Sequence, residues 1–404
     1  MRILFLTQWF NPEPQFKGLA FAKELQRRGH QVEVLTGFPN YPCGKVYPGY
    51  RIRMVQREEM EGVPVIRVAL YPSHDQSPLR RIFNYLSFAL SATLMGPWLV
   101  AEADVMYVLH PPATVGIPAI AISLLRRIPF AYDIQDLWPD TLRSTGMVRF
   151  GWMIALVDVW CRFIYRVAGA ITVISKGFER TLLERQVLKE KISVIPNWCD
   201  EEQLYPGELR KEEQHWFDGK FSIVFAGNMG KAQALESVIQ AAALLKPRCP
   251  EVQFILVGHG VGVECLKRKA EQLGADNLVF LPGRPVSEIG PILHHADALL
   301  VHLKRDPLFE ITIPSKIQAY LSVGRPILCG VSGDASVMVN ESGSGICYQP
   351  ENPFALLDAI EALMALPPIQ RKSMGQNGQR YYREHLSLKV GTGQFEAVFR
   401  SLAK

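Results

Sequence analysis

The residues of this sequence best suited to chemistry lie between positions 309 and 328. Glu310 precedes a β-branched run, and Ser315 and Lys316 then open an expected helix that ends at Gly324. Unpaired backbone N–H groups at a helix start carry a partial positive charge that attracts phosphate. A nearby carboxylate can accept hydrogen bonds from sugar hydroxyls. The segment therefore predicts a site for a nucleotide sugar.

Two earlier turns could hold the same phosphates. Asn228, Gly230 and Lys231 follow a strand pattern and precede a helix pattern that begins at Leu235. Glycine allows the backbone to approach phosphate oxygens closely, and lysine neutralises their charge. Alternatively, Lys231 is a solvated lysine at a helix start. Gly258 follows the next strand, and it either lines the same site or belongs to an ordinary turn.

Gly18 and Arg284 are further candidates because each follows the end of a predicted strand. Gly18 precedes a helix over 19–28, so its loop either receives a diphosphate or is a plain βα turn. The chain has no GxGxxG motif, which makes a dinucleotide-binding interpretation weak. Strand ends of open α/β sheets border the ligand, so a nucleobase is expected near Arg284.

Three carboxylates follow one strand of the first half: Asp133, Asp136 and Asp140, with Trp138 among them. Such a group can hold an acceptor hydroxyl or act as a general base, and Asp136 is the candidate for that role. The alternative is that Asp136 or Asp140 only caps the next helix.

The composition is that of an ordinary globular protein. The chain has 404 residues, of which 48% are hydrophobic and 21% charged, and this length suggests two or three domains. The net charge of +5 fits an anionic ligand or an anionic membrane surface. Seven scattered cysteines and the lack of a secretory signal predict a cytoplasmic protein. No histidine spacing suggests a metal site, and neither a cofactor nor nucleic acid is expected.

Short apolar runs alternate with helical patterns along the whole chain. Such runs suit parallel strands covered on both faces, so each half is expected to be a doubly wound α/β domain. The expected domains are 1–200 and 201–386, with a helix in 387–404 that packs back on the first domain. The predicted strands are 3–7, 32–36, 65–68, 105–109, 130–133, 171–174, 192–195, 222–226, 253–257, 278–281, 298–302, 326–329 and 345–348.

Residues 82–101 form an uncharged segment long enough, in principle, to cross a bilayer. Asn84, Tyr85 and Pro97 make it a poor spanning helix. We expect either a helix at the membrane interface, preceded by two arginines, or a buried domain helix. The aromatic and basic stretch 150–166 could join the same surface or pack in the core.

Five stretches identify a family likeness: RRGHQVEVLTGFPNYPCGKVYPGY (27–50), YDIQDLWPD (132–140), ISVIPNWCD (192–200), FAGNMGKAQALE (225–236) and DPLFEITIPSKIQAYLSVGRPIL (306–328). With them the chain resembles the retaining family-4 glycosyltransferases of GT-B architecture over nearly its full length. It is most similar to the WbuB-like branch, which resembles N-acetyl-fucosamine transferases of bacterial surface-polysaccharide assembly.

The resemblance implies two Rossmann-like domains with the active site between them. The second domain would bind a nucleotide sugar, most often UDP-linked, and the first would bind the acceptor. Transfer would retain the anomeric configuration without a metal, and the departing diphosphate would take up the acceptor's proton. The residues that would contact the substrates by motif position are Gly18, Asp136, Gly230, Lys231, Glu310, Ile311, Thr312 and Ile313.

Two positions depart from the family pattern. The second glutamate, which usually holds the ribose, would fall at Gln318 or Ala319, and Gln318 could still bind a ribose hydroxyl. Asn228 stands where a basic residue is common, so Lys231 and Lys316 would have to supply the positive charge.

These observations predict a hexosyltransferase-type glycosyltransferase. It would move a sugar, with an N-acetylated deoxyhexose favoured, from a UDP-sugar to a lipid-linked saccharide of the undecaprenyl-diphosphate type. The product would enter O-antigen or capsule, and the enzyme would sit peripherally on the inner face of the plasma membrane. The alternatives are a nucleotide-sugar epimerase and a non-catalytic sugar-binding subunit of an assembly complex. A dehydrogenase is disfavoured because the glycine fingerprint is missing.

Overall fold

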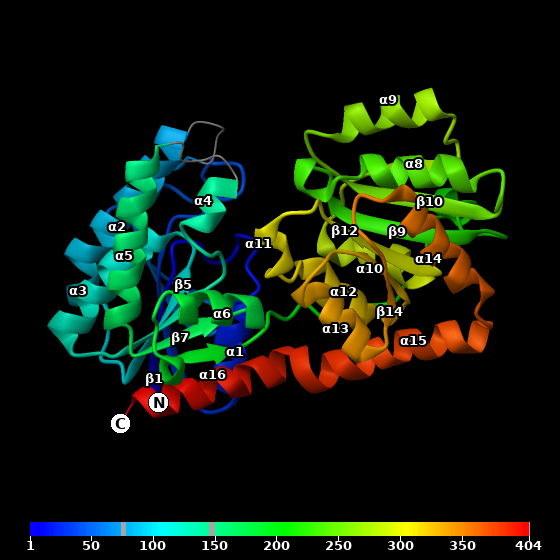
Figure 1. Ribbon diagram of the computed structural model, residues 1–404. Coiled ribbons are helices and arrows are strands. Elements are labelled where there is room, and N and C mark those ends of the chain that lie inside the picture. Colours follow the sequence, from blue (N-terminus) through cyan, green and yellow to red (C-terminus); the bar gives the residue numbers. More distant parts are fainter. Residues whose placement is uncertain (74–77, 145–149, 404) are drawn as a thin grey trace. The chain divides into compact units, whose positions relative to one another are not determined.

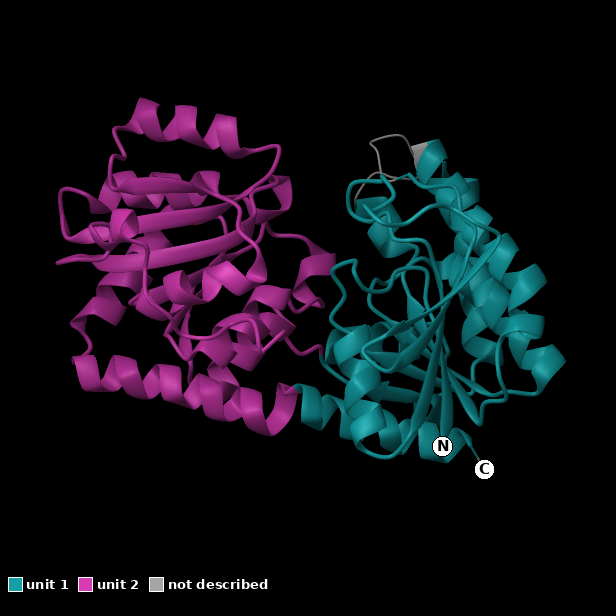
Figure 2. Ribbon diagram, turned by 180° about the vertical axis from the view of Figure 1, so that it is seen from behind, with its two compact units in different colours: residues 1–196, 388–404 teal, residues 197–387 magenta. Residues whose placement is uncertain are grey.

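The computed structural model describes residues 1–73, 78–144 and 150–403 (Figure 1). The chain divides into two compact units (Figure 2). Unit 1 comprises Met1–Pro196 together with the C-terminal helix α16 (Leu388–Leu402), and unit 2 comprises Asn197–Ser387. Both are doubly wound α/β domains, which confirms the predicted fold class.

Unit 1 is built on a sheet of eight strands within the described residues, in the order β3-β4-β2-β1-β5-β6-β7-β8. All neighbours are parallel except β3 and β4, which form an antiparallel pair at the edge. The order reverses direction between β1 and β5, and the loops at the carboxyl ends of these strands diverge there. The strands are β1 (Arg2–Leu6), β2 (Gln31–Gly37), β3 (Val55–Met60), β4 (Val63–Val68), β5 (Val105–His110), β6 (Phe130–Ile134), β7 (Ala170–Val173) and β8 (Ile192–Val194).

Helices cover both faces of this sheet (Figure 1). They are α1 (Leu19–Arg27), α2 (Pro78–Leu99), α3 (Gly116–Arg126), α4 (Asp140–Ser144), α5 (Gly151–Val167), α6 (Lys176–Glu184) and α16, with short 3₁₀ turns η1 (Ala113–Val115) and η2 (Lys189–Lys191). The C-terminal helix completes the core, because Phe395 and Phe399 are fully buried and their rings contact Tyr107 of β5. Phe395 also packs on Phe21 of α1.

Unit 2 has a fully parallel sheet of six strands within the described chain, in the order β11-β10-β9-β12-β13-β14. This is the doubly wound order whose reversal point lies between the first strand and the fourth, here β9 and β12. The strands are β9 (Phe221–Asn228), β10 (Val252–His259), β11 (Leu278–Pro282), β12 (Ala298–His302), β13 (Ile327–Gly330) and β14 (Gly345–Cys347).

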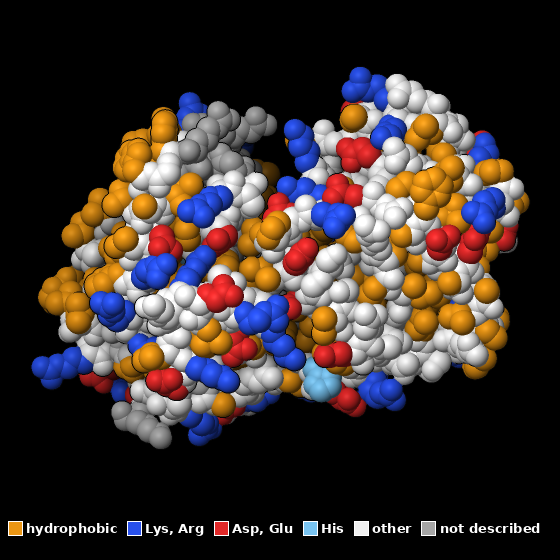
Figure 3. All heavy atoms as spheres, in the orientation of Figure 1, with side chains coloured by type: hydrophobic (Ala, Val, Ile, Leu, Met, Phe, Trp, Pro, Cys, Tyr) orange, Lys and Arg blue, Asp and Glu red, His pale blue; other side chains and the backbone are white. Residues whose placement is uncertain are grey.

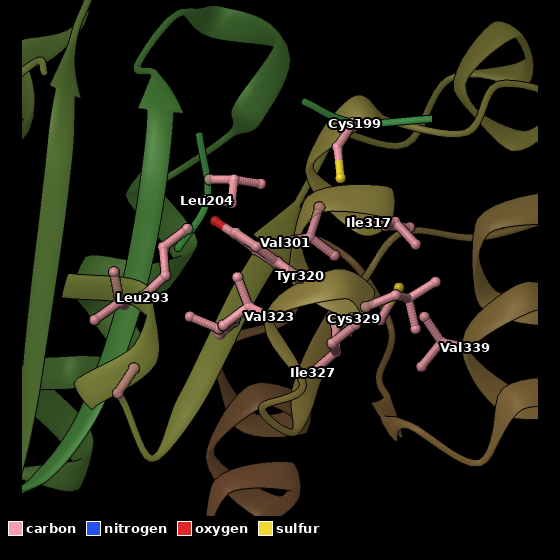
Figure 4. Close-up of a cluster of buried hydrophobic side chains, with 14 of the residues drawn as sticks. Cys199, Leu204, Leu293, Val301, Ile317, Tyr320, Val323, Ile327, Cys329 and Val339 are labelled. Atoms are coloured by element: carbon pink, nitrogen blue, oxygen red, sulfur yellow. The ribbon is translucent and has the colours of Figure 1, made fainter. Parts of the chain in front are cut away.

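The helices of unit 2 enclose two apolar cores, one on each face of its sheet. They are α7 (Lys211–Gln214), α8 (Glu236–Leu245), α9 (Val263–Leu273), α10 (Val286–His295), α11 (Pro307–Glu310), α12 (Ser315–Val323), α13 (Asp334–Ser342), α14 (Pro353–Ala365) and α15 (Pro368–Tyr381), with the 3₁₀ turn η3 (Lys231–Gln233) and the π turn η4 (Tyr382–Leu386). Figure 4 shows part of one core, in which Ile317 and Tyr320 of α12 pack with Val301 of β12. This packing fixes the helix that carries Lys316.

Candidate functional site

The predicted donor residues of unit 2 gather where β9 and β12 end. The loop after β9 contains Gly227, Asn228 and Gly230, and the chain after β12 leads through α11 to α12. A backbone hydrogen bond of 2.9 Å from Lys304 N to Ala232 O joins the two loops. The reversal of strand order thus brings together segments about 80 residues apart in the sequence, as the doubly wound fold requires.

Lys316 lies directly against the glycine turn after β9. A Cβ atom at Gly227 would lie 2.8 Å from Lys316 Cε and 3.0 Å from its Nζ. The ammonium group also stands over the Phe225 ring, 4.9 Å from the ring centroid. The absence of a side chain at Gly227 therefore leaves room for the lysine beside the backbone of β9.

Packing on the opposite face of α12 sets this position. Ile317, Tyr320 and Leu321 are buried in the core under the helix. The Tyr320 hydroxyl accepts a 3.0 Å hydrogen bond from Ala226 N, the amide that precedes the glycine turn. Pro314 starts the helix and Gly324 ends it in a left-handed conformation, as the sequence predicted.

The charge of Lys316 is uncompensated among the described residues, where its ammonium group makes no ion pair or hydrogen bond. Burial lowers the pKa of Lys316 from 10.5 to about 8. The first backbone amide of α12 with a partner is Ile317 N, bonded to Pro314 O at 2.9 Å. The amides of Ser315 and Lys316 are therefore available beside the ammonium group, and together they form a site for an anion.

The turn after β9, which faces Lys316, carries no side chain at the position where β9 pairs with β10. Gly258 is the partner of Gly227 in the register, and a Cβ atom at Gly258 would lie 1.8 Å from Gly227 O. Gly230 N donates to the Gln233 side chain at 3.0 Å, which closes the turn before η3. Asn228 and Lys231 are exposed at this turn. The structure thus brings Gly227, Gly258 and Lys316 together and leaves Lys231 on the rim.

The acidic end of the predicted segment is also at this edge. Glu310 is exposed at the end of α11 and has no partner among the described side chains. Ile311 and Thr312 are half-buried, Ile313 is buried, and the Thr312 hydroxyl donates to Leu308 O at 2.7 Å. The chain between α11 and α12 forms neither a strand nor a helix.

Two of the predicted contact residues have partners within the protein. Gln318 is only 2% exposed, and its amide donates to the carbonyl groups of Pro314 at 2.9 Å and Ser315 at 3.1 Å in the orientation that satisfies its neighbours. It lies on the buried face of α12, so it cannot reach a ribose. Arg284 forms an ion pair with the buried Glu213 and is not a free cation for a ligand.

In unit 1 the structure separates the three carboxylates in β6 and the segment after it. Asp133 is buried and accepts hydrogen bonds from Lys17 at 2.9 Å, Tyr107 at 2.7 Å and Thr172 at 2.7 Å. Asp140 forms an ion pair with Arg185. Of the three, only the Asp136 carboxylate lacks a hydrogen bond or ion pair within the described ranges, which leaves it available to a ligand.

Asp136 lies among aromatic side chains. Its charge raises the pKa of both Tyr41 and Tyr85, where burial is the larger cause. Trp9 contacts the Tyr41 ring at 4.7 Å and the Tyr85 ring at 6.2 Å between centroids. Burial raises the pKa of Asp136 itself to about 6. A carboxyl group beside aromatic rings suits a sugar, whose hydroxyls and apolar ring face need both.

Gly18 and two residues that sequence reasoning missed shape the loop after β1. The Asn11 side chain accepts a 2.8 Å hydrogen bond from Leu19 N, and a Cβ atom at Gly18 would lie 2.3 Å from that oxygen. Lys17 enters the buried pair with Asp133. The buried Glu13 accepts hydrogen bonds from the amides of Phe10, Asn40 and Tyr41, and desolvation raises its pKa to about 7. No local motif marks Lys17 or Glu13, because their partners are distant in sequence.

The side chains that could bind a metal are scattered through both units. Across 1–73, 78–144 and 150–403, no cluster of histidine, cysteine, aspartate or glutamate side chains is arranged to hold a metal ion.

An apolar face covers one side of unit 1. Within the described residues no helix is both long and apolar enough to cross a membrane. The exposed residues of α2 are nevertheless large and apolar, apart from Arg80 in its first turn. Helix α3, which packs against α2 and α5, adds two exposed leucines (Figure 3). We use the term apolar face for the following exposed residues of α2, α3 and α5: Leu79, Phe83, Leu86, Leu90, Leu94, Trp98, Leu124, Leu125, Trp152, Leu156, Val159 and Phe163.

Comparison with known proteins agrees with this geometry. The family described as glycosyl transferase 4-like domain matches residues 19–198, and the family described as glycosyl transferases group 1 matches residues 208–381. The two matches cover most of both units. The chain therefore belongs to the glycosyltransferases of family 4 with the GT-B fold.

Individual relatives have low sequence identity to this chain but match most of its length. WcaI of Escherichia coli K12, named as a glycosyl transferase of colanic acid biosynthesis, is 26% identical over 90% of this chain and 92% of its own. WbjE of Pseudomonas aeruginosa, named as a glycosyltransferase, is 26% identical over 67% of each chain. The structure of HepE from Anabaena, solved with UDP and glucose, superposes with a TM-score of 0.70 at 16% identity and covers 99% of both chains.

Proposed function

We propose that this protein is a retaining glycosyltransferase that uses a UDP-sugar, with an N-acetylated deoxyhexose as the transferred sugar. The observation that carries the proposal is Lys316, a half-buried cation without an anionic partner among the described residues, at the start of α12 and beside the bare turn at Gly227. A diphosphate supplies the missing negative charge. The HepE structure, which contains UDP and glucose, supports a nucleotide-sugar donor.

The donor site stabilises the charge that develops as the sugar leaves. The bond between the anomeric carbon and the diphosphate oxygen breaks, and the electron pair stays on the diphosphate. Lys316 and the first amides of α12 are preorganised for that charge, and Lys231 adds a second cation from the rim. Glu310 accepts hydrogen bonds from hydroxyls of the donor sugar, while the backbone at Ile311–Ile313 contacts sugar and phosphate.

The acceptor hydroxyl binds at Asp136. The carboxylate accepts its hydrogen bond and orients the oxygen, which forms the new bond on the face from which the diphosphate departs. The proton passes to a diphosphate oxygen, so no metal is needed for proton balance. We propose that transfer proceeds at an unchanged rate when divalent ions are removed with EDTA.

The acceptor is proposed to be a lipid-diphosphate-linked saccharide of bacterial surface polysaccharide, such as O-antigen or capsule. The name of WcaI, a glycosyl transferase of colanic acid biosynthesis, supports a place in polysaccharide synthesis. The apolar face supports a lipid-linked acceptor, because clustered exposed apolar side chains mark interaction surfaces. The enzyme would then work peripherally on the inner face of the plasma membrane.

The deciding experiment measures donor binding and turnover together. The intact protein is titrated with UDP-, GDP- and dTDP-sugars by thermal shift, since a specific ligand at a hundredfold excess over Kd stabilises by about 2.7 kcal/mol. The best donor is then incubated with a synthetic polyprenyl-diphosphate saccharide. Release of UDP coupled to a longer lipid saccharide supports the proposal. Conversion of the donor to an isomeric nucleotide sugar without an acceptor would contradict it.

A further inference from the structure

A basic pocket lies at the C-terminal end of α5, and none of the donor or acceptor candidates lines it. Its volume is about 240 Å³, below the range usual for nucleotide-sized ligands. Four cations line it, Arg162, Arg166, Arg185 and Lys191, together with Tyr165 and Leu188. None of the described residues that line it is acidic. The pocket therefore suits a small anion.

Two of the four charges are not neutralised by carboxylates. Arg162 pairs with Asp158 at 2.7 Å, and Arg185 pairs with Asp140. Lys191 Nζ donates to Arg166 O at 2.8 Å and to Ala168 O at 2.9 Å, carbonyl groups at the end of α5. Within the described chain the Arg166 guanidinium has no partner. Arg166 and Lys191 thus leave a surplus of positive charge in the pocket.

The pocket continues the apolar face. The exposed positions of α5 follow one stripe, on which Trp152, Leu156 and Val159 come first and Arg162 and Arg166 last. At 1.5 Å per residue, the whole stripe from 152 to 166 is about 21 Å long. A surface that meets the apolar residues therefore meets the arginines too. This pattern, apolar side chains beside arginines, is what a lipid surface with phosphate headgroups recognises.

We infer that this pocket binds the phosphate of an anionic phospholipid headgroup when the apolar face rests on a membrane. The inference deepens the membrane part of the proposed function and rests on it. The headgroup phosphate pairs with Arg166 and Lys191, and the acyl chains lie against α5 and α2. The occupant is a lipid rather than free phosphate, because the adjoining stripe requires an apolar partner.

The test compares vesicle binding of the intact protein and two charge-matched variants by sedimentation. One set of vesicles is phosphatidylcholine alone, and the other contains about one third phosphatidylglycerol. Arg166→Gln removes the pocket charge, whereas Arg53→Gln removes an exposed arginine outside the pocket. We expect Arg166→Gln to lower binding to anionic vesicles about fivefold, with little change for Arg53→Gln and for neutral vesicles.

The outcomes separate this inference from the proposed function. Equal binding of both variants to anionic vesicles, or equal binding of the intact protein to both vesicle types, would overturn the inference alone. Binding of millimolar inorganic phosphate in the pocket, without a preference of the protein for anionic vesicles, would also overturn it. The pocket would then be a site for a soluble anion. Absence of binding to either vesicle type would overturn the membrane part of the proposed function as well. An unchanged Tm and circular dichroism spectrum show that each variant is folded.

Discussion

The backbone of Gly333, before α13, lies directly on the carbonyl group of Glu310, at the end of α11. A Cβ atom at Gly333 would lie 1.9 Å from Glu310 O, and the φ of Gly333 is +76°. The loop after β13 therefore holds the end of α11 in place, and any side chain at position 333 must displace the proposed sugar-binding carboxylate.

Replacement of Gly333 tests that support. Gly333→Ala should lower transfer at least tenfold, because the new methyl group displaces Glu310, and strain at positive φ adds about 1–3 kcal/mol of destabilisation. Gly343→Ala is the matched control, since Gly343 ends the same helix at φ +58° and a Cβ atom there would have its nearest neighbour, Asn377 Nδ2, 3.5 Å away. It should lose stability but keep its kcat/KM. Glu310→Gln should lose activity at an unchanged Tm. Similar kinetics in Gly333→Ala and Gly343→Ala would remove the role of this contact.

Removal of the Lys316 charge should abolish donor stabilisation without harming the fold. Lys316→Met removes the charge and keeps the length of the side chain. We expect transfer to fall at least about a hundredfold, as it does when other preorganised groups that stabilise transition-state charge are removed. The Tm without ligand should stay equal or rise, because a desolvated cation without a partner is removed. Lys372→Met, an exposed lysine on α15, is the control. UDP-sugar binding at wild-type affinity in Lys316→Met would contradict the assignment.

Donor binding should depend on pH through the same lysine. The pKa of Lys316 is about 8 in the folded protein and 10.5 in the reference state, so the free protein loses this cation as the pH rises above 8. The affinity for UDP should then fall by up to about tenfold per pH unit. Folding stability should change in the opposite direction. It should rise between pH 8 and 10.5, because the unfolded chain binds more protons than the folded protein in that range. Isothermal titration at several pH values should show the fall, and Lys316→Arg should flatten it.

Asp136 and Asp140 should respond in opposite ways to the same substitution. The pKa of Asp136 is raised to about 6 from 3.8, so its ionised form destabilises the fold above pH 6. Asp136→Asn should therefore keep or raise the Tm at pH 7.5 while kcat falls at least about tenfold and UDP binding is unchanged. Asp140→Asn breaks the ion pair with Arg185 and should lower the Tm with a smaller effect on kcat. Full activity of Asp136→Asn would exclude Asp136 from the acceptor site.

The apolar face should be needed for membranes and not for folding. Leu90→Ser with Leu94→Ser removes two exposed side chains from α2, which are 62% and 64% accessible. We expect the variant to leave the membrane fraction while soluble-donor binding persists, at a cost of less than about 1 kcal/mol in stability. Leu273→Ser, an exposed leucine of α9 in unit 2, is the control for general solubility. A wild-type protein found entirely in the cytosolic fraction would contradict the membrane proposal.

Apolar runs were sufficient to predict the parallel strands. All thirteen predicted strands are present, each within a few residues of its expected bounds. The edge strand β3 was missed, because its sequence VQREEM is polar and its side chains face solvent at the sheet edge. A strand that borders only one neighbour does not need the apolar pattern that revealed the others.

The proximity of the donor-site candidates is easier to read from the sequence than that of the groups around the acceptor candidate, for a physical reason. Lys316 and Glu310 belong to one contiguous segment, so their proximity is visible in the sequence. The relation of Lys17 to Asp133 joins residues 116 positions apart, and only the folded sheet brings them together. Residue type alone did not show that Gln318 lies on the buried face of α12. Sequence spacing predicts which groups share an element, and packing decides which of them reach a ligand.

The burial of Phe395 and Phe399 has a consequence for how unit 1 is assembled. Their rings occupy the core of unit 1, and Phe395 also lies 4.8 Å under the Lys17 ammonium group. Residues 1–196 alone lack these two side chains, because the helix that carries them follows the whole of unit 2 in the sequence. A fragment that stops at residue 196 would leave that part of the core unfilled, so the isolated domain should require α16 to be fused back to it.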